Sequence, residues 1–116
     1  MKPLRLAHTR RHIEVFRDTA GVPHVRGKSW LDAIYGLGYM HGTDRPTQMH
    51  FGRAVALGRA AERIADRPEL VETDKFFRRI GLYLNVEREV SRLDDHTFSQ
   101  LTAYCEGARW RWRCCW

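Results

Sequence analysis

The side chains with the clearest chemical potential lie between residues 35 and 45, in the stretch Tyr-Gly-Leu-Gly-Tyr-Met-His-Gly-Thr-Asp-Arg. His41 and Asp44 are close enough in sequence to form a hydrogen-bonded pair, as a general base and the group that orients it would. A catalytic dyad also needs a nucleophile beside the base, and none stands in view of this pair. We therefore expect a structural role for the pair, at a junction between two helices.

Three glycines, Gly36, Gly38 and Gly42, share this stretch and invite comparison with dinucleotide-binding loops. Their spacing is GxGxxxG, whereas the dinucleotide fingerprint is GxGxxG placed between a strand and a helix. The residues before them predict a capped helix rather than a strand. Glycine inside a helix costs roughly 1 kcal/mol against alanine, so we interpret these glycines as sites of tight packing against a neighbour.

Histidine and cysteine spacing does not indicate a metal site. His8 and His12 are four residues apart, but they lie in a basic N-terminal arm that has no helical pattern. The three cysteines, Cys105, Cys114 and Cys115, form no CxxC pair, and their odd number does not make a disulfide framework. Cys105 falls on an apolar stripe, where a cysteine is usually a small buried side chain.

The serines also lack a catalytic setting. Ser29, Ser91 and Ser99 are expected at helix caps or on polar helical faces, and none stands in a GxSxG motif. From the residues alone we predict no catalytic, cofactor-binding or metal-binding residue in this chain.

Composition places the chain among ordinary globular proteins. Its 116 residues correspond to one small domain or a piece of one, with 43% hydrophobic and 29% charged residues. The net charge of +6 permits attraction to nucleic acid or anionic lipid, but a solvated basic surface is the simpler interpretation. No apolar run approaches the roughly 20 residues of a spanning helix, and the start lacks the apolar core of a secretory signal. We expect neither nucleic acid nor a membrane as a partner.

A β-hairpin is predicted near the N-terminus. Residues 13–18 and 22–27 are rich in β-favouring side chains and are separated by a short turn. Asp18 suits the first position of a type I turn, and Gly21 can take the left-handed conformation that follows it. Pro23 cannot donate to a ladder, so the second strand should lie at an edge or begin beside a bulge.

Two helices are predicted to meet within the stretch that contains the glycines. Ser29 and Asp32 have the spacing of a capping box, so the first helix should begin there. Asp44 is the expected N-cap of the second helix, which should run to about Gly58 with Pro46 in its first turn.

Two further helices are predicted after Pro68, which should close the preceding region. Thr73 is the expected cap of a helix over residues 74–92. Asp94 or Asp95 is the expected cap of the last helix. The apolar face of the last helix should comprise Phe98, Leu101 and either Tyr104 or Cys105. The predicted fold class is α+β, an N-terminal β-hairpin followed by about four helices.

The last segment, residues 108–116, reads Ala-Arg-Trp-Arg-Trp-Arg-Cys-Cys-Trp and departs from everything before it. Tryptophan that stacks or sits at interfaces, beside arginine that meets phosphate, is compatible with a tail for nucleic acid or a membrane surface. The alternative is a shifted reading frame, because GC-rich codons read in another frame could encode alternating alanine and leucine.

Several linked blocks resemble the N-terminal part of the α-subunit of penicillin acylases (penicillin amidases). The resemblance covers roughly residues 12–107, and the order and spacing of the blocks make it more specific than any one block. The blocks are Val15–Asp18, Gly21–Val25, Tyr35–His41, Asp44–Arg45, Gln48–Met49, Glu72–Arg78, Gly81–Leu82 and Tyr104–Gly107.

The resemblance implies a fragment of an N-terminal-nucleophile hydrolase with an αββα core. Such enzymes are made as one precursor that cleaves itself into α and β chains, and they hydrolyse linear amides such as β-lactam antibiotics or acyl-homoserine lactones. Their nucleophile is usually the first serine of the β chain, whose α-amino group acts as the base. Nucleophile, oxyanion-hole donors and usual calcium ligands all lie downstream of this match, so no catalytic residue is carried over. Calcium is possible only in the full-length enzyme.

The sequence departs from the family pattern at three places. Pro46 stands where an apolar residue is usual and His50 where an acidic one is common, and both could loosen the second helix. The pattern also ends after Gly107. The expected organisation is a basic arm over residues 1–11, an acylase-like segment over 12–107 and an atypical tail over 108–116.

The leading functional hypothesis is the N-terminal fragment of a penicillin-acylase-type amidohydrolase, inactive alone. Its expected partners are the missing β-chain portion of the same precursor and, in the intact enzyme, an acyl-amide substrate. The alternative is a small basic protein that binds nucleic acid or a membrane surface through the Arg/Trp tail. Relatives are often periplasmic or secreted, yet no signal is expected here, so the compartment stays open.

Overall fold

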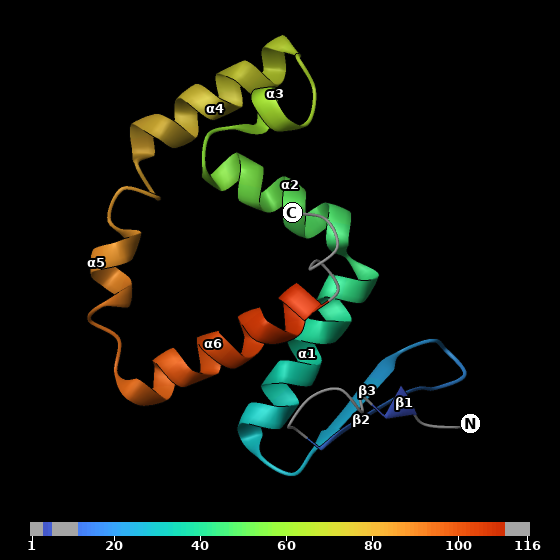
Figure 1. Ribbon diagram of the computed structural model, residues 1–116. Helices are drawn as coiled ribbons and strands as arrows, with labels where there is room; N and C mark the ends of the chain where they lie inside the picture. The colour runs from blue at the N-terminus through green and yellow to red at the C-terminus, as the bar shows by residue number, and fades with distance from the viewer. Residues whose placement is uncertain (1–3, 6–11, 111–116) are drawn as a thin grey trace. The chain divides into compact units, whose positions relative to one another are not determined.

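The computed structural model describes residues 4–5 and 12–110 (Figure 1). They contain a three-stranded sheet and six helices, which confirms the α+β class and adds two short helices to the expected four. The chain is divided into two compact units. The first comprises residues 1–45 and 94–116, and the second comprises residues 46–93. The elements are β1 (Leu4–Arg5), β2 (Ile13–Arg17), β3 (Pro23–Gly27), α1 (Trp30–Asp44), α2 (Pro46–Ala56), α3 (Ala60–Arg63), α4 (Pro68–Ile80), α5 (Val86–Val90) and α6 (Asp95–Trp110).

The predicted hairpin is confirmed in strands β2 and β3, which pair antiparallel in the register Val15 with Val25. At the turn the carbonyl of Asp18 accepts from the amide of Gly21 at 3.0 Å, and Gly21 has φ +80°. That backbone angle favours glycine because it lacks a Cβ. Strand β3 lies at an edge of the sheet, where Pro23 leaves no ladder bond unmade. Strand β1 pairs with the other side of β2 and was not predicted, because the N-terminal arm shows no strand pattern.

The predicted capping box at the start of α1 is also confirmed. The amide of Asp32 donates to Ser29 Oγ at 3.1 Å, and the amide of Ser29 donates to Asp32 Oδ2 at 3.2 Å. The helix then continues through all three glycines to Asp44. Asp44 was expected to cap the next helix, but it is the last residue of α1, and Arg45 alone separates it from α2.

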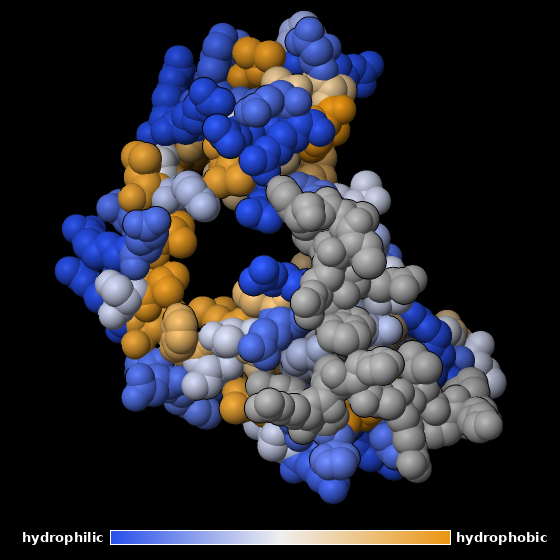
Figure 2. All heavy atoms as spheres, in the orientation of Figure 1, coloured by the Kyte–Doolittle hydropathy of each residue, from blue (hydrophilic) through white to orange (hydrophobic). Residues whose placement is uncertain are grey.

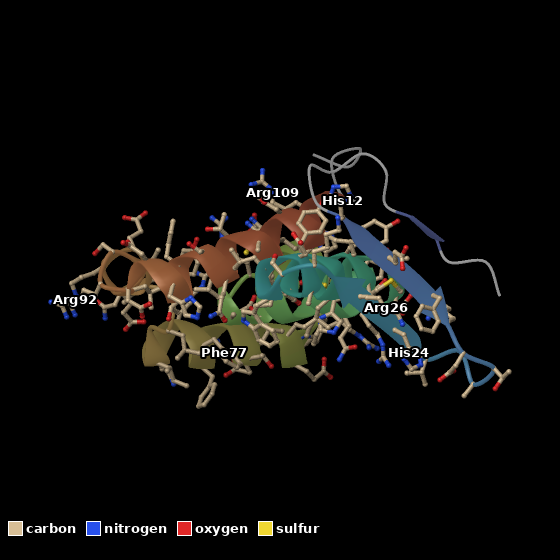
Figure 3. All side chains as sticks on the ribbon, turned by 90° about the horizontal axis from the view of Figure 1, so that it is seen from below. His12, His24, Arg26, Phe77, Arg92 and Arg109 are labelled. Carbon is tan, nitrogen blue, oxygen red and sulfur yellow. The ribbon has the colours of Figure 1, made fainter. Side chains whose placement is uncertain are left out.

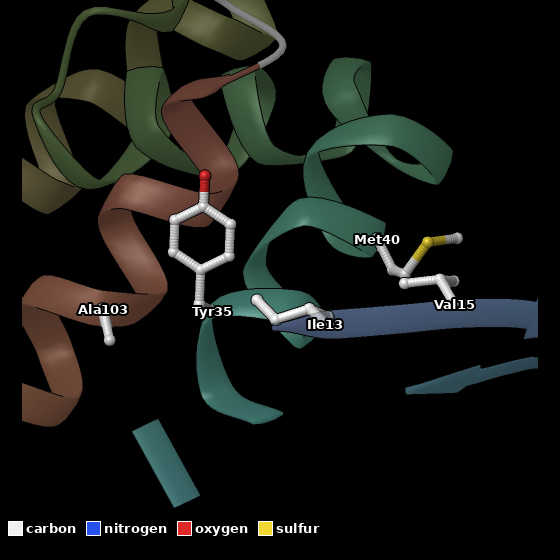
Figure 4. Close-up of a cluster of buried hydrophobic side chains, with 5 residues drawn as sticks. All are labelled: Ile13, Val15, Tyr35, Met40 and Ala103. Carbon is white, nitrogen blue, oxygen red and sulfur yellow. The ribbon is translucent and has the colours of Figure 1, made fainter. Parts of the chain in front are cut away.

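The core of the first unit lies where the sheet, α1 and α6 meet (Figure 4). Burying apolar side chains from separate elements is the main force that holds such a small unit together. The buried cluster consists of Ile13, Val15, Tyr35, Met40 and Ala103.

In the second unit one carboxylate joins two helices. Asp74 on α4 is buried, and its oxygens accept from the amides of Ala60 and Ala61 at 2.7 and 2.9 Å. It thereby satisfies donors at the start of α3, where the helix has no capping side chain of its own. Nearby, Arg78 Nε donates to the carbonyl of Gly58 at 2.7 Å, so α4 holds the turn before α3 from two positions.

The boundaries predicted for the third helix were wrong. Helix α4 begins at Pro68, a first-turn position where a missing N–H does no harm, so this proline opens a helix rather than closing a region. Thr73 lies inside α4, and its hydroxyl donates to the carbonyl of Glu69. Gly81 takes φ +70° and ends the helix, so residues 74–92 are divided between α4 and α5.

Helix α6 begins as predicted but buries a different face. The amide and the hydroxyl of Thr97 donate to the Asp94 carboxylate at 2.9 and 2.8 Å, which confirms the cap. Phe98 and Leu101 are about half exposed, and Cys105 is exposed rather than buried. The buried positions of α6 are instead small: Ala103, Gly107 and Ala108.

Candidate functional site

The stretch from Tyr35 to Arg45 forms most of α1 and packs on two sides. On one side Gly36 faces the sheet, where an added Cβ would lie 2.4 Å from Cγ1 of Val25 and 3.1 Å from Cγ2 of Ile13. Real Cβ contacts are longer than 3.0 Å, so only glycine lets the sheet come this close. The tight packing predicted for this glycine is confirmed.

On the other side Gly38 and Gly42 face the backbone of α6. A Cβ added to Gly38 would lie 2.2 Å from the carbonyl oxygen of Tyr104, and one added to Gly42 would lie 2.7 Å from that of Ala108. The glycines thus form a seam between helices rather than a loop around a phosphate, as the sequence indicated.

Helix α6 also contributes a glycine, Gly107, to this contact with α1. A Cβ added to Gly107 would lie 2.0 Å from the carbonyl oxygen of Tyr35 and 3.0 Å from the amide nitrogen of Tyr39. Backbone carbonyls cannot move aside as a flexible side chain can, so both helices require a missing Cβ here. Sequence reasoning quoted Gly107 only within a family block and assigned it no packing role.

His41 and Asp44 do not form the predicted pair, because each has a different partner. His41 Nδ1 lies 2.9 Å from the hydroxyl of Tyr104, with the two rings edge to face. Asp44 Oδ1 accepts from Arg17 Nη2, and Arg17 Nη1 also donates to the carbonyl of Gly21. His41 therefore contacts α6, whereas Asp44 contacts the hairpin.

Burial raises the pKa of the Tyr104 phenol above its ordinary value, and the neighbouring Cys105 adds to the effect. Tyr104 is therefore protonated at neutral pH, and its hydroxyl can pair with His41 Nδ1 as donor or acceptor according to the imidazole tautomer. This contact joins the exposed His41 side chain on α1 to Tyr104 on α6.

Each of the three serines is used by the helix next to it. Ser29 caps α1, the Ser91 hydroxyl donates to the carbonyl of Arg88 at 2.8 Å, and the Ser99 hydroxyl donates to the carbonyl of Asp95 at 2.7 Å. Local bonds of this kind are typical of serine at caps and turns. The predicted structural positions of the serines are confirmed.

A contact between a carboxylate and an imidazole lies at the hairpin tip. His24, seen on β3 in Figure 3, lies 3.0 Å through Nε2 from Asp18 Oδ2 and stacks on Phe16. The hydrogen bond to His24 lowers the pKa of the Asp18 carboxyl, and the backbone amides of Val22 and Ala20 lower it further.

Among the described residues, histidine, cysteine and carboxylate side chains do not gather in groups of three or more that could hold a metal. His8, Cys114 and Cys115 lie outside the described residues. In the same part of the chain no helix is both long and apolar enough to cross a bilayer.

The fold and the glycine seam define the class of protein: an α+β segment in which a hairpin supports two helices in backbone contact. The penicillin amidase family model matches residues 12–108. The chain belongs to the penicillin amidase family, to whose N-terminal part it corresponds.

Individual relatives agree with this assignment. Over 95 residues the chain is 37% identical to Penicillin acylase 2 proenzyme of Pseudomonas sp. (strain SE83), covering 82% of this chain and 12% of that protein. It is 35% identical over 71 residues to Acyl-homoserine lactone acylase QuiP of Pseudomonas aeruginosa, covering 61% of this chain and 8% of that protein. The chain therefore spans about a tenth of the length of these relatives.

A solved structure shares the arrangement of elements. The thermostable penicillin G acylase from Alcaligenes faecalis superposes with a TM-score of 0.75 at 27% identity, over 87% of this chain and 53% of that one. This likeness confirms the predicted fragment of a penicillin acylase fold.

Proposed function

We propose that the chain is the N-terminal fragment of an amidohydrolase that cleaves linear amide bonds between an acyl group and an amine. The names of its relatives support two substrate classes, penicillins and acyl-homoserine lactones. In the intact enzyme the substrate is then a small acyl amide, and the acyl group distinguishes the two classes.

The role proposed for this segment is structural. The observation that carries this proposal is that the segment's candidate catalytic side chains already have structural partners. All three serine hydroxyls bond to neighbouring backbone, and His41 contacts Tyr104. A hydroxyl nucleophile must instead lie beside a free base with room for a substrate carbonyl. The segment alone is therefore expected to have no amidase activity.

The nucleophile and its base then come from the rest of the precursor, the portion that becomes the β chain. Support comes from length, because the relatives named above are about ten times longer than the segment they share with this chain. The glycine seam would give that portion a rigid α1–α6 platform on which to fold.

The experiment compares two preparations with a chromogenic phenylacetyl amide and with an acyl-homoserine lactone. One is the chain itself, and the other is a chimera in which residues 12–108 replace the matching segment of the Pseudomonas proenzyme. Turnover by the chimera and none by the chain alone is the expected result. Turnover by the chain that disappears when one of its own serines is replaced would refute the structural role.

The nucleic-acid or membrane alternative depends on residues 108–116, most of which lie outside the described residues. Nothing in the described part of the chain favours it over the amidase assignment, so the tail is given no function.

A further inference from the structure

We draw no further inference here: the strongest candidate, the apolar surface patch that Leu82, Leu84 and Val86 form over the turn after α4 and the start of α5 (Figure 2), is one of several groups of exposed apolar side chains on the chain, and nothing in the structure shows what covers it.

Discussion

The main-chain carbonyl of Tyr35 lies so close to Gly107 that a Cβ on this glycine would sit 2.0 Å from the oxygen. Helices α1 and α6 therefore meet backbone to backbone, without a layer of side chains between them. Because α1 also packs on the sheet through Gly36, this contact joins elements from opposite ends of the chain in one core.

Replacing Gly107 with alanine should destabilise the protein, even though alanine is the better helix former. Overpacking a filled contact costs about 1–3 kcal/mol, which outweighs a propensity gain of about 1 kcal/mol. The measurement is the free energy of unfolding in urea. Gly52→Ala is the control, because a Cβ added there meets no atom within 4 Å, and it should leave stability unchanged or raise it. A Gly107→Ala variant as stable as Gly52→Ala would contradict the seam.

Replacing Asp74 with alanine should destabilise the second unit by about 2–3 kcal/mol, because two amides near α3 lose a charged acceptor. Thermal unfolding followed by circular dichroism measures the loss. Asp66→Ala removes an exposed carboxylate in the same unit and should change stability by less than about 0.5 kcal/mol. Equal effects of the two substitutions would show that Asp74 does not organise α3.

Acid should weaken the hairpin through Asp18. Its hydrogen bond to His24 lowers the carboxyl pKa in the folded state below 3.8, so the unfolded state binds the proton first. The ionised Asp18 carboxylate stabilises the fold fully above the pKa of the unfolded state, and this stabilisation is lost as the pH falls through the folded-state pKa. An NMR titration of the Asp18 side chain measures the carboxyl pKa, and the free energy of unfolding measured against pH gives the loss of stability. The Asp18→Asn variant should lose less stability on acidification than the parent, and an identical loss would exclude this carboxylate as the cause.

Tyr104 should ionise later than a free phenol, because burial and Cys105 raise its pKa above 10.0. Ultraviolet absorbance during an alkaline titration should show a late component that disappears in Tyr104→Phe. The same variant removes the hydroxyl 2.9 Å from His41 and should cost about 0.5–1.5 kcal/mol. A titration unchanged by Tyr104→Phe would mean that another tyrosine is responsible.

Local signals account for the parts of the fold that could be predicted. The turn of Asp18 and Gly21 and the capping box of Ser29 and Asp32 depend on groups a few residues apart. Their geometry is determined by short-range hydrogen bonds and by backbone angles that favour glycine, so it follows from spacing alone. The predicted structural role of Gly36 was confirmed for the same reason, since a helix tolerates glycine at a cost that packing must offset.

Contacts between distant residues account for the errors. Thr73 is a residue type that often caps helices, but α4 already begins at Pro68. The next residue, Asp74, accepts hydrogen bonds from the amides of Ala60 and Ala61, which are far away in sequence. Spacing on one helix cannot show which face a neighbour covers. For α6 the largest side chains therefore suggested the wrong face, because a backbone contact with α1 selects the smallest ones.

The separation of His41 from Asp44 has a similar cause. Their spacing allows a pair, but Tyr104 lies 63 positions after His41 and Arg17 lies 27 positions before Asp44. Neither partner is visible in the local sequence. The resemblance to penicillin acylases rests on the Tyr35–His41 and Tyr104–Gly107 blocks among others, but it did not predict that the two blocks lie in contact.

Amide hydrolysis by the paired preparations tests the central claim most directly. The account predicts that the 116-residue chain hydrolyses no phenylacetyl amide above the buffer rate, while the chimera that carries residues 12–108 within the Pseudomonas proenzyme does. Hydrolysis by the isolated chain through one of its own side chains, or a folded chimera without activity, would contradict it.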